Sequence, residues 1–206
     1  GPPADHPFHF SQLNVILDRT GYLLEVFADG LINGAYETTS YEYAPMCRFF
    51  AHLCLYLKMI DIFVPPNASS IILEAYLQVL EAAGQRDLIA IYAGALGENA
   101  IQRYALFLVS LELSTDVNER RLALTRAKEH GLDMDSVAAA TAEMTINKAM
   151  EMLPILKGPL PSIITVQPPP SDAELFLLRS IEWIVFSEAT YDKALEQANH
   201  ILRYFL

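Results

Sequence analysis

Residues 71–96, with the sequence IILEAYLQVLEAAGQRDLIAIYAGAL, decide the fold. Apolar residues recur every three or four positions on both sides of Gly84, which is the period of an α-helix. Asn67, Ser69 or Ser70 can cap the first helix, and glycine commonly follows a helix end. Two helices joined by a short turn lie antiparallel, and such pairs are the units that stack into α-solenoids.

The same helix-start and helix-end signals continue on both sides of this pair. Proline at helix starts, glycine after helix ends and Ser, Thr or Asp at capping positions delimit eight or nine helices. Eight of these helices cover approximately residues 45–60, 69–83, 87–96, 98–113, 116–130, 133–153, 172–186 and 190–206.

No segment shows a convincing strand pattern, and the best candidate, residues 163–166, lies between prolines. Residues 154–171 hold six of the twelve prolines, and we interpret them as a long extended internal connection. No strict repeat period is present. We therefore predict an all-α fold, an irregular α-solenoid of helix pairs, with residues 1–206 forming a single helical domain.

The net charge and the lengths of the apolar runs argue against two classes of partner, nucleic acids and membranes. The 206 residues include 25 acidic and 14 basic residues, which gives a formal net charge of −11. Nucleic-acid binding needs a basic surface, so we expect no direct nucleic-acid partner. No apolar run approaches the ~18 residues that cross a bilayer, so we expect no membrane insertion. The densest basic cluster is flanked by acidic residues and is interpreted as a solvated helix face; it comprises Arg120, Arg121, Arg126 and Lys128.

No catalytic constellation is recognisable. The sequence has no Gly-x-x-x-x-Gly-Lys phosphate loop, no Gly-x-Ser-x-Gly nucleophile turn and no His-Glu-x-x-His pair. His52 and Cys54 stand two apart on a predicted helix and point about 160° from each other, so they cannot share a metal. His52 is interpreted as a packed or partner-contacting residue. We predict a non-enzymatic protein with no bound metal and no cofactor.

The two cysteines, Cys47 and Cys54, are interpreted as small core residues. Seven helical residues separate them by roughly 10 Å along the helix axis. A disulfide requires Cα atoms within about 7 Å, so the two cannot pair, which fits a reducing compartment. Trp183, which lies in an apolar run, is interpreted as a core tryptophan.

Two predicted helices, residues 45–60 and 98–113, are apolar nearly all round, in a chain that is 52% apolar. A helix of this kind is enclosed by neighbours. Those neighbours can all belong to this chain, or a second molecule can supply one wall.

Candidate partner-binding residues follow from the first of these helices. The helix has two apolar sides, its exit at residues 62–64 is apolar as well, and only one side needs to face the chain's own core. We hypothesise that four residues lie on or near a surface that meets a protein partner, with a few of them dominating the contact. These are Leu55, Met59, Phe63 and Ile72. The alternative is that all four are ordinary core residues.

Several helical segments, taken in order, resemble one known family. They are residues 48–55 (RFFAHLCL), 73–76 (LEAY), 88–92 (LIAIY), 104–108 (YALFL), 181–186 (IEWIVF), 194–199 (ALEQAN) and 203–206 (RYFL). Their order and spacing resemble the nucleoporin 84/107 family of the Y-shaped nuclear pore subcomplex. The resemblance covers roughly residues 45–130 and 175–206.

This resemblance implies a long α-helical scaffold protein of the nuclear envelope, with a chain that doubles back into a crown over a trunk. It implies that the crown contacts a nucleoporin of the 96/145C class. It also implies that a C-terminal tail, expected beyond Leu206, contacts the 133 class. We therefore expect a middle fragment of a structural component that supports mRNA export and protein import. The helical pattern alone also fits a vesicle-coat or peptide-binding helical-repeat adaptor.

Overall fold

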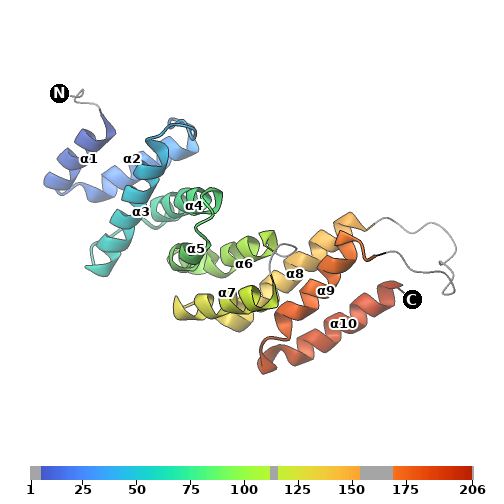
Figure 1. The fold of residues 1–206 in the computed structure, drawn as a ribbon. Coiled ribbons are helices and arrows are strands. Elements are labelled where there is room, and N and C mark those ends of the chain that lie inside the picture. The colour runs from blue at the N-terminus through green and yellow to red at the C-terminus, as the bar shows by residue number, and fades with distance from the viewer. Residues whose placement is uncertain (1–5, 112–115, 154–168, 206) are drawn as a thin grey trace. The chain divides into compact units, whose positions relative to one another are not determined.

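The computed structural model describes residues 6–111, 116–153 and 169–205, and within these residues it contains helices and no strand (Figure 1). This confirms the predicted all-α fold. The strand candidate at residues 163–166 and most of the proline-rich connection lie outside the described residues. The α-helices are α1 (Pro7–Ile16), α2 (Thr20–Ile32), α3 (Tyr43–Met59), α4 (Pro66–Ala82), α5 (Arg86–Gly94), α6 (Ala100–Ser110), α7 (Val117–Glu129), α8 (Met134–Met152), α9 (Asp172–Ile184) and α10 (Tyr191–Phe205), with 3₁₀ turns η1 (Gly97–Asn99) and η2 (Glu188–Thr190).

The sequence pattern placed no helix before residue 45, and the structure has two there, α1 and α2. The apolar residues of α1 do not gather on one buried face. Ser11 and Asn14 are its buried residues, whereas Leu13 and Ile16 are exposed. A pattern that seeks one apolar stripe per helix therefore misses α1.

The chain divides into two compact units, residues 1–97 (unit 1) and 98–206 (unit 2). The single helical domain inferred from the sequence stays a prediction, and each unit is described by itself below.

Unit 1 is organised around α4, which packs against α2, α3 and α5. Pro66 stands in the first turn of α4, where its missing N–H costs no helical hydrogen bond. Neighbouring helices are joined by aromatic contacts as well, since the rings of Phe27 in α2 and Phe50 in α3 stack with centroids 3.8 Å apart. The side chains that α4 buries include Ile72, Leu73, Tyr76, Leu77 and Leu80.

Unit 2 is organised around α8, which packs against α6, α7 and α9. Most of the residues that α8 buries are small, including four alanines, and small residues let neighbouring helices approach closely. Its buried threonines satisfy their hydroxyl groups within the helix. Thr141 donates to the carbonyl of Val137 at 2.7 Å, and Thr145 donates to the carbonyl of Thr141 at 2.6 Å.

The enclosed helices are therefore α4 and α8, and the prediction that residues 45–60 and 98–113 are enclosed is only partly right. In α3, Phe49, Tyr56 and Met59 are exposed, and in α6, Leu106 is 56% exposed. Both helices bury one side against their own unit. Their remaining apolar residues stay in solvent because α4 and α8 occupy the central positions.

The interpretation of Cys47, Cys54 and Trp183 as core residues is confirmed. Both cysteines are fully buried free thiols in α3, and Trp183 is 1% exposed in α9. Burial raises the pKa of Cys54 to about 11 and that of Tyr92 to about 12. In both groups, burial away from water disfavours the anion.

These shifts predict that the protein loses stability at alkaline pH. A group whose pKa is higher in the folded than in the unfolded chain supports stability below its unfolded value, and that support disappears as pH rises through the folded value. For Cys54 the window runs from the ordinary value of 9.0 to about 11. Urea unfolding under reducing conditions should show a falling free energy of unfolding across this window. The Cys54→Ala variant should show a smaller fall, and an equal fall in both proteins would contradict the assignment.

Candidate protein-interaction surfaces

The exit of α3 is shaped by a left-handed residue. Asp61 has φ 57°, its N–H donates to the carbonyl of Lys58 at 3.2 Å, and the N–H of Ile62 donates to the carbonyl of Leu57 at 2.9 Å. This pair of bonds is the Schellman arrangement that closes a helix end. The chain therefore leaves α3 in a defined direction, and Val64 returns to the core.

Five exposed apolar side chains follow one another around this turn. We call them the exit surface of α3: Tyr56, Met59, Ile60, Ile62 and Phe63. Met59 and Phe63 are each 74% exposed, and the other three are at least 41% exposed. Single exposed apolar residues are normal on a protein surface, whereas a group of them is a candidate interaction surface.

The four residues singled out from the sequence have different positions. Met59 and Phe63 lie on the exit surface, and Leu55 is half-buried beside it. Ile72 is fully buried in α4, so its inclusion among the contact residues was wrong. The period of α4 placed Ile72 correctly on an apolar side, but that side faces the neighbouring helices of unit 1. The alternative that all four are core residues is likewise wrong for Met59 and Phe63.

A polar aromatic group holds α3 against its neighbours. His52 Nε2 and Tyr92 Oη form a hydrogen bond of 2.6 Å, which joins α3 to α5. The Tyr92 ring also meets the Tyr76 ring of α4 edge-on, with centroids 4.8 Å apart. His52 is an exposed residue that contacts Tyr76 and Tyr92 within unit 1, so the three helices share a set of contacts beside the exit surface. No local sequence signal marks this group, because its members come from three helices.

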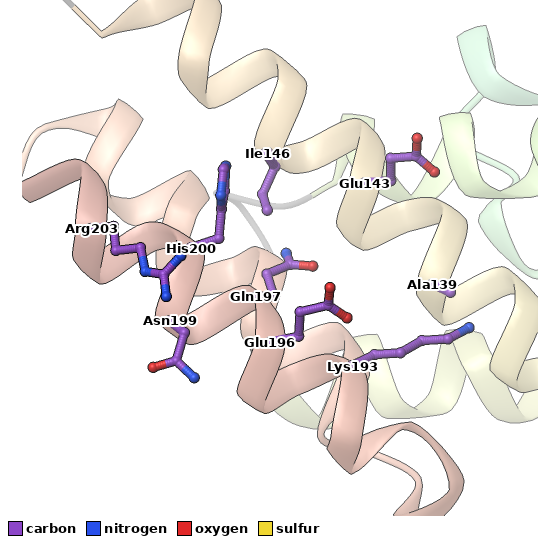
Figure 2. Close-up of a pocket in the computed structure, with 9 residues that line it drawn as sticks. All are labelled: Ala139, Glu143, Ile146, Lys193, Glu196, Gln197, Asn199, His200 and Arg203. Atoms are coloured by element: carbon purple, nitrogen blue, oxygen red, sulfur yellow. The ribbon is translucent and has the colours of Figure 1, made fainter.

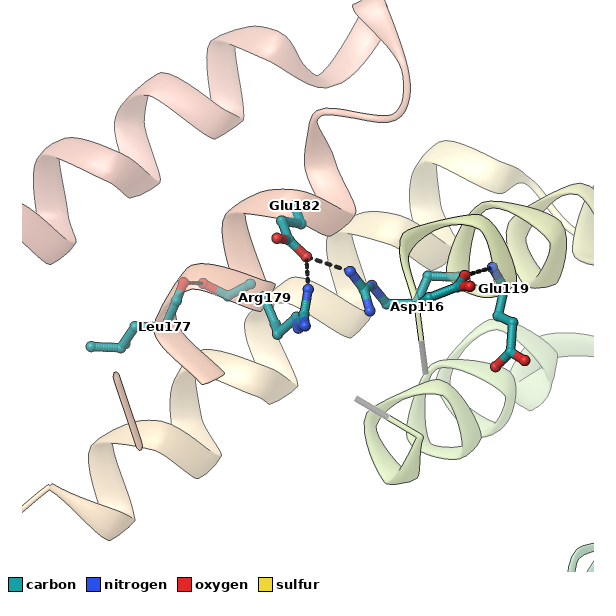
Figure 3. A network of polar contacts seen from close by, with 7 residues as sticks. Asp116, Glu119, Leu177, Arg179 and Glu182 are labelled. Atoms are coloured by element: carbon teal, nitrogen blue, oxygen red, sulfur yellow. Dashed lines mark hydrogen bonds and ion pairs between the residues drawn. The ribbon is translucent and has the colours of Figure 1, made fainter. Parts of the chain in front are cut away.

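Unit 2 contains an ion-pair network between α7 and α9 (Figure 3). Glu182 Oε2 accepts from Arg120 Nη2 and from Arg179 Nη1, both at 2.6 Å. Arg120 is only 2% exposed, so the interpretation of its basic cluster as a solvated face was wrong for this residue. Burial is the main cause that lowers the pKa of Arg120, and the charge of Arg179 adds to it, whereas Glu182 opposes the shift. The ion pair between Arg120 and Glu182 therefore joins α7 to α9.

A groove of about 810 Å³ lies between α8 and α10 (Figure 2). Its charged residues are of mixed sign, and no Ser, Thr or Cys is among the residues that line it. Within the described residues, no group of three or more His, Cys, Asp or Glu could hold a metal. The lining residues of the groove are Ala139, Glu143, Ile146, Lys193, Glu196, Gln197, Asn199, His200 and Arg203.

Among the helices that the structure describes, none combines the length and the apolarity needed to cross a membrane. Comparison with known proteins decides what kind of helical protein this is. Residues 2–206 match the family model described as Nuclear pore protein 84 / 107. The chain belongs to this family. The match confirms the resemblance seen in the sequence and extends it over the first 44 residues and the proline-rich connection.

Relatives with the same assignment occur in distant organisms. The chain is 28% identical over 200 residues to "Nuclear pore complex protein Nup107" of Mus musculus, which covers 97% of this chain and 20% of the relative. It is 24% identical over 208 residues to "Nucleoporin nup107" of Schizosaccharomyces pombe, covering 98% and 25%. It is 27% identical over 196 residues to "Nuclear pore complex protein Nup107" of Drosophila melanogaster, covering 95% and 22%. The chain thus spans a fifth to a quarter of the length of these relatives.

The network in unit 2 predicts a difference between two charge-removing variants. Glu182→Gln should lower the free energy of unfolding by about 1–3 kcal/mol, because it removes the carboxylate that accepts a hydrogen bond from the buried Arg120 guanidinium. Arg179→Gln removes a partly exposed partner and should cost less than about 1 kcal/mol. Urea denaturation of both variants tests this. Equal losses would show that the burial of Arg120 does not decide the energy of the network.

Proposed function

We propose that the chain is part of a structural scaffold protein of the nuclear pore complex at the nuclear envelope. It acts by protein–protein contact within the Y-shaped subcomplex and in this way supports mRNA export and protein import. The observation that carries the proposal is the family match over residues 2–206. The all-helical fold agrees with a scaffold role, and the same match favours a nuclear pore protein over a vesicle-coat or peptide-binding adaptor. A structural, non-enzymatic role follows from the same proposal.

Within this role, the exit surface of α3 is the contact for a nucleoporin of the 96/145C class. Its side chains project from a helix that is anchored by six buried residues and by the His52–Tyr92 bond. A surface that is ordered before binding loses less conformational freedom when the complex forms. Each large apolar side chain buried in such a contact is worth roughly 1.5–3 kcal/mol. Met59 and Phe63, the two most exposed members, are the expected anchors. We propose that a contact with the 133 class lies outside residues 1–206.

Charge substitution at the anchors tests this contact. Met59→Glu and Phe63→Glu place a carboxylate on an exposed surface, so the melting temperature should stay close to that of the unmodified chain. Binding to a purified 96/145C-class nucleoporin, measured by isothermal titration calorimetry, should weaken at least tenfold, which corresponds to about 1.4 kcal/mol. Leu106→Glu is the matched control, because Leu106 is an exposed leucine in unit 2 and should leave binding unchanged.

The buried residue Ile72 provides the opposite control, a substitution that should destabilise the fold. Ile72→Ala should lower the free energy of unfolding by about 2–5 kcal/mol, because it opens a cavity in the centre of unit 1. If Met59→Glu unfolds the protein as Ile72→Ala is expected to do, the exit-surface assignment fails. If Met59→Glu and Phe63→Glu fold and bind as well as the unmodified chain, the contact lies elsewhere. Failure of the unmodified chain to bind would argue against the 96/145C-class partner itself.

A further inference from the structure

A small cavity in unit 1 is lined by side chains from α1, α2 and α3. Its volume is about 190 Å³. Leu23 and Phe27 of α2 and Phe50 of α3 line it together with Ser11 of α1, and each of these four residues is at most 3% exposed. They form the floor of the cavity.

Three half-buried residues complete the lining and form the mouth of the cavity. They are Phe10 of α1, Val26 of α2 and Tyr36, which follows α2. Because these side chains keep part of their surface in solvent, the cavity opens outward at them and is not sealed inside the core. We call the cavity, with its floor and mouth, the aromatic pocket.

The wall of the aromatic pocket is built from rings that hold one another in place. The Tyr36 ring lies against α2 at Gly30, where an added Cβ would stand only 2.5 Å from Tyr36 Cε2. The same ring contacts the Phe27 ring with centroids 5.0 Å apart, and Phe27 in turn stacks on Phe50 at 3.8 Å. The pocket is therefore formed before any ligand arrives, as ligand sites usually are.

The lining offers little to a water molecule. Among the described side chains that line the pocket, only Ser11 and Tyr36 carry polar atoms, and Ser11 already takes part in an interaction of its own. A buried water needs about two to four polar partners, whereas an apolar cavity of about 150 Å³ stays dry and binds benzene. The aromatic pocket is slightly larger than that and equally apolar.

We propose that the aromatic pocket takes one aromatic ring of benzyl size, supplied as a phenylalanine side chain of a partner protein. The volume admits one such ring, and the rings of the lining offer the edge-to-face and offset contacts that aromatic pairs prefer. That the ring belongs to a protein rests on the proposed function in protein–protein contact, in which aromatic anchors commonly fill pockets. The pocket shares no residue with the exit surface of α3.

Toluene and N-acetyl-phenylalanine amide test the proposal on the 206-residue chain. Toluene should raise the melting temperature as its concentration increases, because a ligand that binds only the folded state stabilises it. Nuclear Overhauser effects between toluene and the ring protons of Phe27 and Phe50 should place the ligand in the pocket. N-acetyl-phenylalanine amide should bind at least about tenfold more tightly than N-acetyl-alanine amide, which lacks the ring.

A variant that fills the pocket provides the matched comparison. Val26→Phe places an additional ring at the mouth and should weaken the binding of both ring compounds at least about tenfold. Val79→Phe makes the same change at a half-buried valine of α4 that does not line the pocket, and it should leave binding intact. The Overhauser contacts are measured on the unmodified chain, so they decide the question even if Val26→Phe does not fold.

Failure of both ring compounds to bind the unmodified chain would overturn the proposal, as would an equal loss of binding in the two variants. Binding of toluene without binding of N-acetyl-phenylalanine amide would overturn the assignment to a protein side chain, and the pocket would then be a site for free apolar molecules. No other nucleoporin takes part in these titrations, and Met59→Glu should not affect them. Their outcome is therefore distinguishable from a failure of the exit-surface contact or of the proposed function.

Discussion

Enclosure of one helix by its neighbours is the constraint on which each unit depends. In unit 1 the enclosed helix is α4, which contacts α2, α3 and α5, and in unit 2 it is α8, which contacts α6, α7 and α9. Burying apolar side chains on several sides of one helix supplies most of the stabilisation available to a helical unit. It also assigns every other helix a peripheral position, with one side buried and one side left for solvent or for a partner.

The exposed apolar surfaces follow from those peripheral positions. The α3 helix buries Cys47, Phe50 and Cys54, and its end carries Met59 and Phe63 into solvent. The α9–α10 pair buries one face through contact with α8 and leaves Leu195 and Leu202 outside. Exposed apolar helix surfaces of this kind agree with the proposed role in protein–protein contact.

Polar contacts between distant parts of the sequence keep the peripheral helices in place. The bond between His52 and Tyr92 spans 40 residues, and the bond between Arg120 and Glu182 spans 62. Apolar burial alone tolerates sliding and rotation of one helix on another, because it is not directional. The directional bond from the buried Arg120 guanidinium to Glu182 restricts that freedom, because a shift of either helix would weaken it.

The sequence by itself determined the helical class, most helix boundaries from α3 onward, and the core positions of Cys47, Cys54 and Trp183. These features depend on the helical period and on capping residues, which act within one or two turns of chain. It also identified Met59 and Phe63 as candidates, because the exit of α3 is apolar beyond what one buried side requires. Only the tertiary structure decided that Ile72 and Arg120 are buried, and that α4 and α8 are the enclosed helices. The physical reason is that burial depends on which helices become neighbours, and that depends on contacts between residues far apart in the chain.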